Sequence, residues 1–164
     1  MSDVLSLIES IKNVAGESPC KKKVQKIAYL IQEANAPDDL GFDFSIHFFG
    51  PYSRDLDSEI RYFYNCGDLN VEITNYEHRL SVNNHEDATP VNQAVQNIID
   101  KFARKNPSEL ELLATTLYIQ REVQDARRQD IVNGVFKIKG SKYSETQISE
   151  AIQELESNDY FLCA

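Results

Sequence analysis

The sequence predicts a mainly α-helical protein with a small antiparallel β-ribbon (class α+β), in which a winged-helix-like N-terminal half precedes a helical C-terminal half. Three observations support this class. Apolar residues recur at the 3.6-residue spacing of amphipathic helices through most of the 164 residues. Residues 69–82 contain two short segments that alternate apolar and polar residues, as strands do. The 41% hydrophobic and 26% charged residues match an ordinary globular domain and argue against disorder.

Two helices are expected first. Asp3 can cap the earlier one, and Gly16 ends it. The second helix starts after Pro19, stops near Pro37, and begins with the lysines Lys21, Lys22, Lys23 and Lys26. The helix dipole disfavours cations at this end, so these lysines either form a solvated face or are held there by another interaction.

A half-buried strand is expected over residues 42–48, because apolar and polar residues alternate there. Gly50-Pro51 predicts a turn, Ser53 can cap the following helix, and Gly67 ends that helix. The unit of helix, strand, turn and helix over residues 20–67 is the clearest local prediction. A hairpin follows, with strands at 69–73 and 80–82 and a turn at 75–78. This element order is close to that of winged-helix modules.

Residues 84–88 are polar enough to link a winged-helix-like subdomain (1–83) to a helical subdomain (89–164). In the second subdomain, Thr89 and Pro90 predict the first helix start, and Asn106-Pro107 predicts the next. A weaker helical pattern covers residues 123–138. Ser144 and Gln147 predict a capping box for the last helix.

The formal net charge of −9 argues against general affinity for nucleic acids. Residues 37–90 contain three Arg against eleven acidic residues. A recognition helix and wing within this segment would repel phosphate, so a winged-helix half is expected to act through a protein partner rather than through DNA.

No motif for catalysis, nucleotide binding or metal binding stands out. The chain lacks a nucleophile elbow and a glycine-rich phosphate loop, and the three histidines and three cysteines have no metal-ligand spacing. We therefore expect no enzyme, no cofactor, no catalytic or metal-binding residues, and thiols with a packing role. The alternative is an enzyme of unrecognised type, in which His47, Tyr52 and a nearby carboxylate share a cleft.

Two short segments resemble a known family. Residues 23–32 read KVQKIAYLIQ, and residues 47–56 read HFFGPYSRDL. Together they resemble the YwgA-like group of uncharacterised prokaryotic proteins, and they are more distantly similar to the Panacea antitoxin domain. Residues 110–115 and 144–155 are also similar to the former group. The resemblance implies a prokaryotic cytosolic protein with no settled activity and no catalytic residues, whose distant relatives include antitoxins and regulators.

The sequence is compatible with three functions. The first is a cytoplasmic regulatory or protein-interaction module, with an antitoxin-like role as its finer form and these candidate partner-binding residues: Lys23, Gln25, Lys26, Tyr29, His47, Tyr52 and Arg54. The second is a winged-helix DNA-binding transcriptional regulator that contacts phosphate through Lys21, Lys22, Lys23 and Lys26. The third is the enzyme above. The N-terminus does not have the pattern of a signal peptide and no membrane association is expected, whereas a homo-oligomer is compatible with the sequence.

Overall fold

The computed structural model describes residues 4–34 and 40–163. Within these ranges the helices are α1 Val4–Ala15, α2 Lys21–Glu33, α3 Arg54–Asn65, α4 Gln93–Phe102, α5 Pro107–Glu122, α6 Arg128–Lys139 and α7 Glu145–Ser157. The strands are β1 Ser45–His47, β2 Gly50–Tyr52, β3 Leu69–Thr74 and β4 Glu77–Val82, and two short 3₁₀ turns are η1 His85–Asp87 and η2 Gly140–Lys142. The predicted α+β class, mainly α, is confirmed. The predicted cap Asp3 lies outside the described residues.

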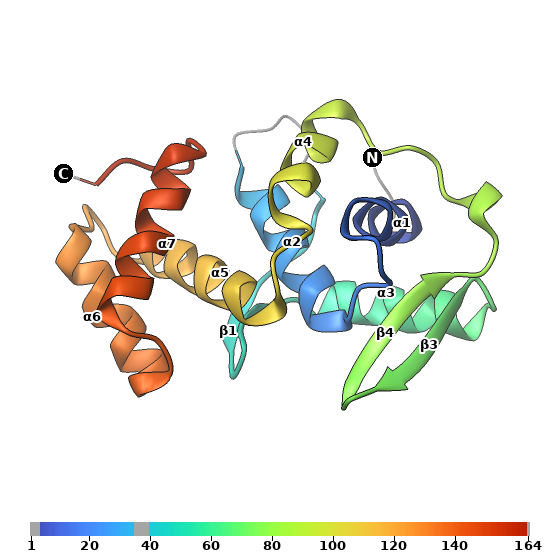
Figure 1. The fold of residues 1–164 in the computed structure, drawn as a ribbon, viewed down its shortest axis with the longest axis horizontal. Helices are drawn as coiled ribbons and strands as arrows, with labels where there is room; N and C mark the ends of the chain where they lie inside the picture. Colours follow the sequence, from blue (N-terminus) through green and yellow to red (C-terminus); the bar gives the residue numbers. More distant parts are fainter. Residues whose placement is uncertain (1–3, 35–39, 164) are drawn as a thin grey trace.

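The molecule is elongated, with α2 near its middle (Figure 1). At one end α1, α3 and the β3–β4 hairpin lie together, and at the other end α6 and α7 pack against α5. Helix α2 contacts α4, α5 and β2, and residues of both predicted subdomains belong to one buried apolar cluster. The division of the chain into subdomains 1–83 and 89–164 with a linker at 84–88 stays a prediction. The two predicted subdomains share one apolar core. None of the helices in the described residues is long and apolar enough to cross a membrane.

The hairpin expected after α3 is present. Strands β3 and β4 are antiparallel, with a register that runs from Leu69 opposite Val82 to Thr74 opposite Glu77. Asn75 and Tyr76 form the turn at φ values of 50° and 64°. Two consecutive positive φ values are typical of a type I′ turn, whose twist matches that of the strands.

The strand and turn predicted over residues 42–51 are placed differently in the structure. Strand β1 is only Ser45–His47, and Gly50-Pro51 is part of strand β2 rather than a turn. The turn lies at Phe48 and Phe49. Proline is tolerated here because the sheet has only two strands, so the missing N–H costs no ladder bond on the open edge.

Helix starts in the second half follow local capping chemistry. Asn106 caps α5 with Pro107 as the first residue, and Ser144 and Gln147 form the predicted capping box of α7. The start predicted at Thr89-Pro90 is wrong. Helix α4 begins at Gln93, because Asn92 accepts a hydrogen bond from the Val95 N–H at 2.8 Å.

Replacing Asn106 by alanine is expected to lower the free energy of unfolding by about 1 kcal/mol. The Asn106 side chain accepts a hydrogen bond from the Glu109 N–H at 2.8 Å, and alanine would leave that donor without its cap. The matched control is Asn133→Ala in the middle of α6, where alanine has the better helix propensity and should not destabilise. Urea unfolding of both variants checks this, and equal losses would contradict the capping role.

Candidate functional site

The candidate site is built on the β1–β2 hairpin, which two buried side chains of α2 hold in place. Gln25 is 3% exposed, and its amide pairs with the backbone of Ser53 in both directions, donating to the carbonyl and accepting from the N–H, each at 2.9 Å. Lys26 is 2% exposed, and its Nζ donates to the Pro51 carbonyl at 2.6 Å. The Gln25 amide therefore satisfies both backbone polar groups of Ser53, as a neighbouring strand would. Lys26 holds the middle residue of β2.

Helix α6 holds the other side of the hairpin. The Nζ of Lys139 donates to the Phe48 carbonyl at 2.8 Å and lies 3.5 Å from Oε2 of Glu111. The Lys139 side chain is 4% exposed. We call Gln25, Lys26, Glu111 and Lys139 the hairpin clamp, because together they fix the backbone on both sides of Gly50.

Glu111 of α5 is the counter-ion of this clamp, and its side chain is fully buried. The Nζ of Lys22 lies 2.8 Å from Oε1, while the Nζ of Lys142 and the hydroxyl of Tyr143 donate to Oε2 at 2.6 and 2.7 Å. Burial alone would raise the pKa of Glu111, but its interactions with Lys142, Lys22 and Tyr143 outweigh burial and lower it to about 2. Glu111 is therefore a carboxylate at neutral pH.

Burial has the opposite consequence for the lysines of the clamp. It lowers the pKa of Lys26 to about 7, and the nearby Glu111 carboxylate only partly offsets this. Burial also lowers the pKa of Lys139. Burial therefore disfavours the ammonium form of both lysines, and the shared Glu111 carboxylate offsets only part of that cost.

The stability of the protein is expected to rise from pH 7 toward pH 10 because of Lys26. In this window the unfolded chain binds a proton at Lys26, with its ordinary pKa of 10.5, that the folded chain has lost. The slope from this group is up to about 1.4 kcal/mol per pH unit. Urea unfolding at several pH values should show a smaller slope for Lys26→Met than for the wild type. Equal slopes would contradict the assignment.

Gly50 lets the hairpin approach α5. Its φ is +93°, and a Cβ at this position would lie 2.6 Å from Oγ1 of Thr115. Thr115 is fully buried, so the threonine has no room to move away freely. The sequence Phe-Gly-Pro-Tyr at 49–52 is thus a close-packing segment, in which glycine is needed both for its φ and for its size.

The clamp presents two aromatic side chains at the tip of the hairpin. Phe48 is 91% exposed and Phe49 is 55% exposed. The ammonium groups of Lys22 and Lys142 lie 4.8 and 5.8 Å from the centre of the Phe49 ring, within cation–π distance. Phe49 therefore lies over the lysines that bind Glu111, and Phe48 extends into solvent.

The tip of the β3–β4 hairpin lies near the tip of the β1–β2 hairpin. Both hairpins point to the lower edge of Figure 1, and Tyr76, in the β3–β4 turn, is fully exposed. Between the tips is a groove of about 320 Å³ lined by Cys20, Lys21, Lys22, Phe49, Tyr76, Glu77 and His78. We call Phe48, Phe49, Tyr76 and this groove the hairpin-tip surface.

Several predicted partner-binding residues are buried. Lys23 is 6% exposed and donates to the Ala103 carbonyl at 2.5 Å, and Tyr29 packs edge-to-face on Phe44 in the core. Gln25 and Lys26 belong to the clamp. The structure gives all four an internal role, because none has a side chain available to a partner.

The proposed nucleic-acid surface is reduced by the same burial. Of its four lysines, only Lys21 and Lys22 are partly exposed, and each faces an acid: Asp57 at 3.6 Å and Glu111 at 2.8 Å. The lysines at the start of α2 therefore interact mainly with groups of the protein itself. These interactions also explain why four lysines are tolerated at a helix N-terminus, where the helix dipole disfavours positive charge.

His47 and Tyr52 do come together, as the enzyme hypothesis requires. Their ring centres are 4.8 Å apart across the β1–β2 hairpin, while Arg54 is exposed at the start of α3. Burial, the charge of Asp57 and a hydrogen bond to Asp57 raise the pKa of Tyr52. The Tyr52 hydroxyl is therefore held protonated, which suits a hydrogen-bond donor better than a catalytic base.

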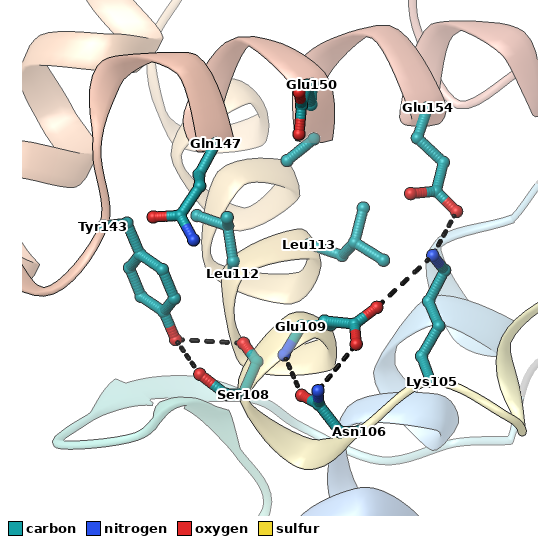
Figure 2. A pocket seen from close by; sticks show the side chains of 11 residues that line it. Lys105, Asn106, Ser108, Glu109, Leu112, Leu113, Tyr143, Gln147, Glu150 and Glu154 are labelled. Carbon is teal, nitrogen blue, oxygen red and sulfur yellow. Dashed lines mark hydrogen bonds and ion pairs between the residues drawn. The ribbon is translucent and has the colours of Figure 1, made fainter.

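A second cavity, of about 460 Å³, lies between α5 and α7 (Figure 2). Leu112 and Leu113 point into it from α5. Lys105 bridges its far side to Glu154 at 2.9 Å and Glu109 at 3.8 Å. Its polar groups thus join the two helices, and no residue predicted from the sequence as a site lies in it.

The fold and the site define a class: a mainly helical α+β protein that holds an exposed aromatic hairpin on a buried lysine–glutamate clamp. The chain is 28% identical to "Uncharacterized protein YwgA" of Bacillus subtilis strain 168, in a match that covers 87% of this chain and 88% of that protein. No family model matches the chain. The comparison supports a YwgA-like, uncharacterised group, and it extends over both halves of the chain.

Proposed function

We propose that this protein is a non-enzymatic protein-interaction module that binds its partner through the hairpin-tip surface. The observation that carries the proposal is the exposure of three aromatic side chains, Phe48, Phe49 and Tyr76, at the tips of two hairpins that flank one groove. Aromatic residues are enriched in protein interfaces, and they contribute large contact areas at low entropic cost.

The clamp beneath the tip supports the same function. A buried ion pair contributes little to net stability, and apolar residues in its place are often at least as stabilising. What this clamp does is fix the position of Phe48 and Phe49, through bonds to the carbonyls on either side of Gly50. A tip fixed before binding loses less conformational entropy when the partner docks.

The finer form of the proposal is a regulatory, antitoxin-like role in the cytoplasm. Its support is the resemblance of residues 23–32 and 47–56 to the YwgA-like group and, more distantly, to the Panacea domain. A gene for a small toxin next to the gene for this protein would favour this role.

A winged-helix DNA-binding regulator is the second candidate function. One observation favours it: Cys20 forms a β-bridge with Arg79, and the Leu80 N–H donates to the Pro19 carbonyl at 2.8 Å, which adds a short third segment beside the wing. Against it, α3 exposes Asp55 and Glu59 where DNA would lie. We expect no mobility shift of duplex DNA even at low salt, and a salt-sensitive shift would favour this candidate.

The double substitution Phe48→Ser with Tyr76→Ser tests the proposed function. Both side chains are exposed, so stability should change by no more than about 0.5 kcal/mol. Co-purification from cells that naturally express the protein should lose its partner. The control is Leu162→Ser, which removes an 86% exposed leucine near the C-terminus. A partner retained by the double variant, or lost equally in the control, would contradict the proposal.

A further inference from the structure

We propose that the hairpin-tip groove binds an acidic peptide segment with one apolar anchor side chain. This inference rests on the proposed function and specifies the partner's chemistry. The apolar part of the groove is formed by Phe49, Tyr76 and the buried Cys20, and one side of it is formed by Lys21 and Lys22. Lys142 is not one of the residues that line the groove, but its ammonium group lies 5.8 Å from the centre of the Phe49 ring, on the same Glu111 carboxylate as Lys22.

The groove region has an excess of positive charge. Lys22, Lys139 and Lys142 each lie within 4 Å of Glu111, so three positive charges share one negative charge, an excess of +2. The whole chain has a formal charge of −9, which makes this a local exception. The negative net charge of the chain repels an acidic partner at a distance. A partner that binds at this groove is therefore expected to place its negative charge next to these lysines.

The acids near the groove do not cancel this excess, since they have basic partners of their own. Glu77, which lines the groove, pairs with Arg79 at 3.2 Å, and Arg79 also pairs with Glu17 at 3.3 Å, so these three side chains together carry one negative charge, which the two basic partners of Asp57 balance. Asp57 lies 3.3 Å from Arg61 and 3.6 Å from Lys21. The carboxylate of a partner would therefore meet Lys22 and Lys142 without an unpaired acid beside it.

Both lysines can bind a second carboxylate while keeping Glu111. Their side chains are 27% and 41% exposed, so each reaches solvent from its buried pair. An ammonium group has three N–H donors, and Glu111 occupies only part of this capacity. The Phe49 ring, which lies over both ammonium groups, supplies an apolar contact next to the charge.

A peptide fits these features better than a nucleic acid does. The groove of about 320 Å³ is at the low end of ligand pockets, which suits one or two side chains. A long polyanion would extend from the groove over α3, where Asp55 and Glu59 are exposed. A short acidic segment avoids that repulsion because its charge is confined to the groove.

Selection of short random peptides displayed on phage against the full-length protein tests the inference. Selected peptides should carry Asp or Glu beside a Leu, Phe or Trp. Binding of a selected peptide, synthesised with a fluorophore, should weaken at least roughly tenfold with the double substitution Lys22→Gln and Lys142→Gln and should fall with salt. The matched control is Lys101→Gln, an exposed lysine of α4. Lys142→Arg keeps the charge and should retain binding, and circular dichroism verifies that each variant folds.

The outcomes separate this inference from the proposed function. The selected peptides could lack an acidic bias and lose binding with Phe48→Ser but not with the lysine changes. That result overturns the acidic-peptide inference but still supports the hairpin-tip surface as the docking surface. Peptides insensitive to both sets of changes overturn both, and failure to select any peptide overturns the inference. It is also overturned if mixed-sequence single-stranded DNA binds through the same lysines, or if self-association lost in Phe48→Ser shows that a second copy occupies the groove.

Discussion

Glu111→Ala is expected to destabilise the protein by about 3–5 kcal/mol, as loss of one partner from a buried ion pair does. The substitution would leave Lys139 and Lys26, both nearly inaccessible, without their counter-ion. It would also remove the nearer of two acceptors of the Tyr143 hydroxyl, at 2.7 Å, and leave the Ser108 carbonyl at 3.0 Å. Urea unfolding monitored by circular dichroism measures the loss.

The control for Glu111 is Glu122→Ala at the end of the same helix. Glu122 is exposed, and an acid near a helix C-terminus faces the negative end of the dipole, so its removal should cost almost nothing. A loss for Glu111→Ala no larger than that for Glu122→Ala would show that the buried carboxylate does not hold the clamp together.

Gly50→Ala is expected to cost about 3 kcal/mol, the sum of two separate effects. A side chain at φ +93° is strained by about 1–2 kcal/mol. A Cβ at 2.6 Å from Oγ1 of Thr115 adds the cost of overpacking, about 1–3 kcal/mol. Thermal or urea unfolding measures the total.

Gly67 offers a matched control for this substitution. Its φ is +86°, and a Cβ there would have no neighbour within 4 Å, so Gly67→Ala should show the conformational cost alone. The difference between the two glycine variants then measures the close contact with α5. In a Thr115→Ala background, which lacks Oγ1, the additional cost of Gly50→Ala should shrink. Equal losses for Gly50→Ala and Gly67→Ala would contradict the close packing.

Local chemistry in the sequence predicts much of the fold. Ser53 caps α3, Asn106 caps α5, and Ser144 with Gln147 caps α7, all as expected, because a cap depends on residues within one turn of itself. Gly50-Pro51 was not predictable in this way. Its dipeptide signals a turn, but packing against Thr115 places it in a strand, and that neighbour is distant in the sequence.

The hairpin clamp could not be predicted from the sequence for a related reason. A run of lysines at the start of a helix reads as a solvated face, and the carboxylate that pairs with Lys22 lies in the other half of the chain. One signal points to it: α5 is apolar on nearly every side around Glu111, with Leu110, Leu112, Leu113 and Ala114 all buried. A charged residue inside such a helix must be buried, and a buried charge needs a partner.

The central claim is that the hairpin-tip surface docks a protein partner. A photo-reactive phenylalanine analogue incorporated at position 48, in cells that naturally express the protein, tests it most directly, with the same analogue at the exposed position 162 as control. We predict one discrete protein adduct from position 48, absent from position 162 and lost when Tyr76→Ser is added. Absence of any adduct from position 48, or the same adducts from both positions, would contradict the claim.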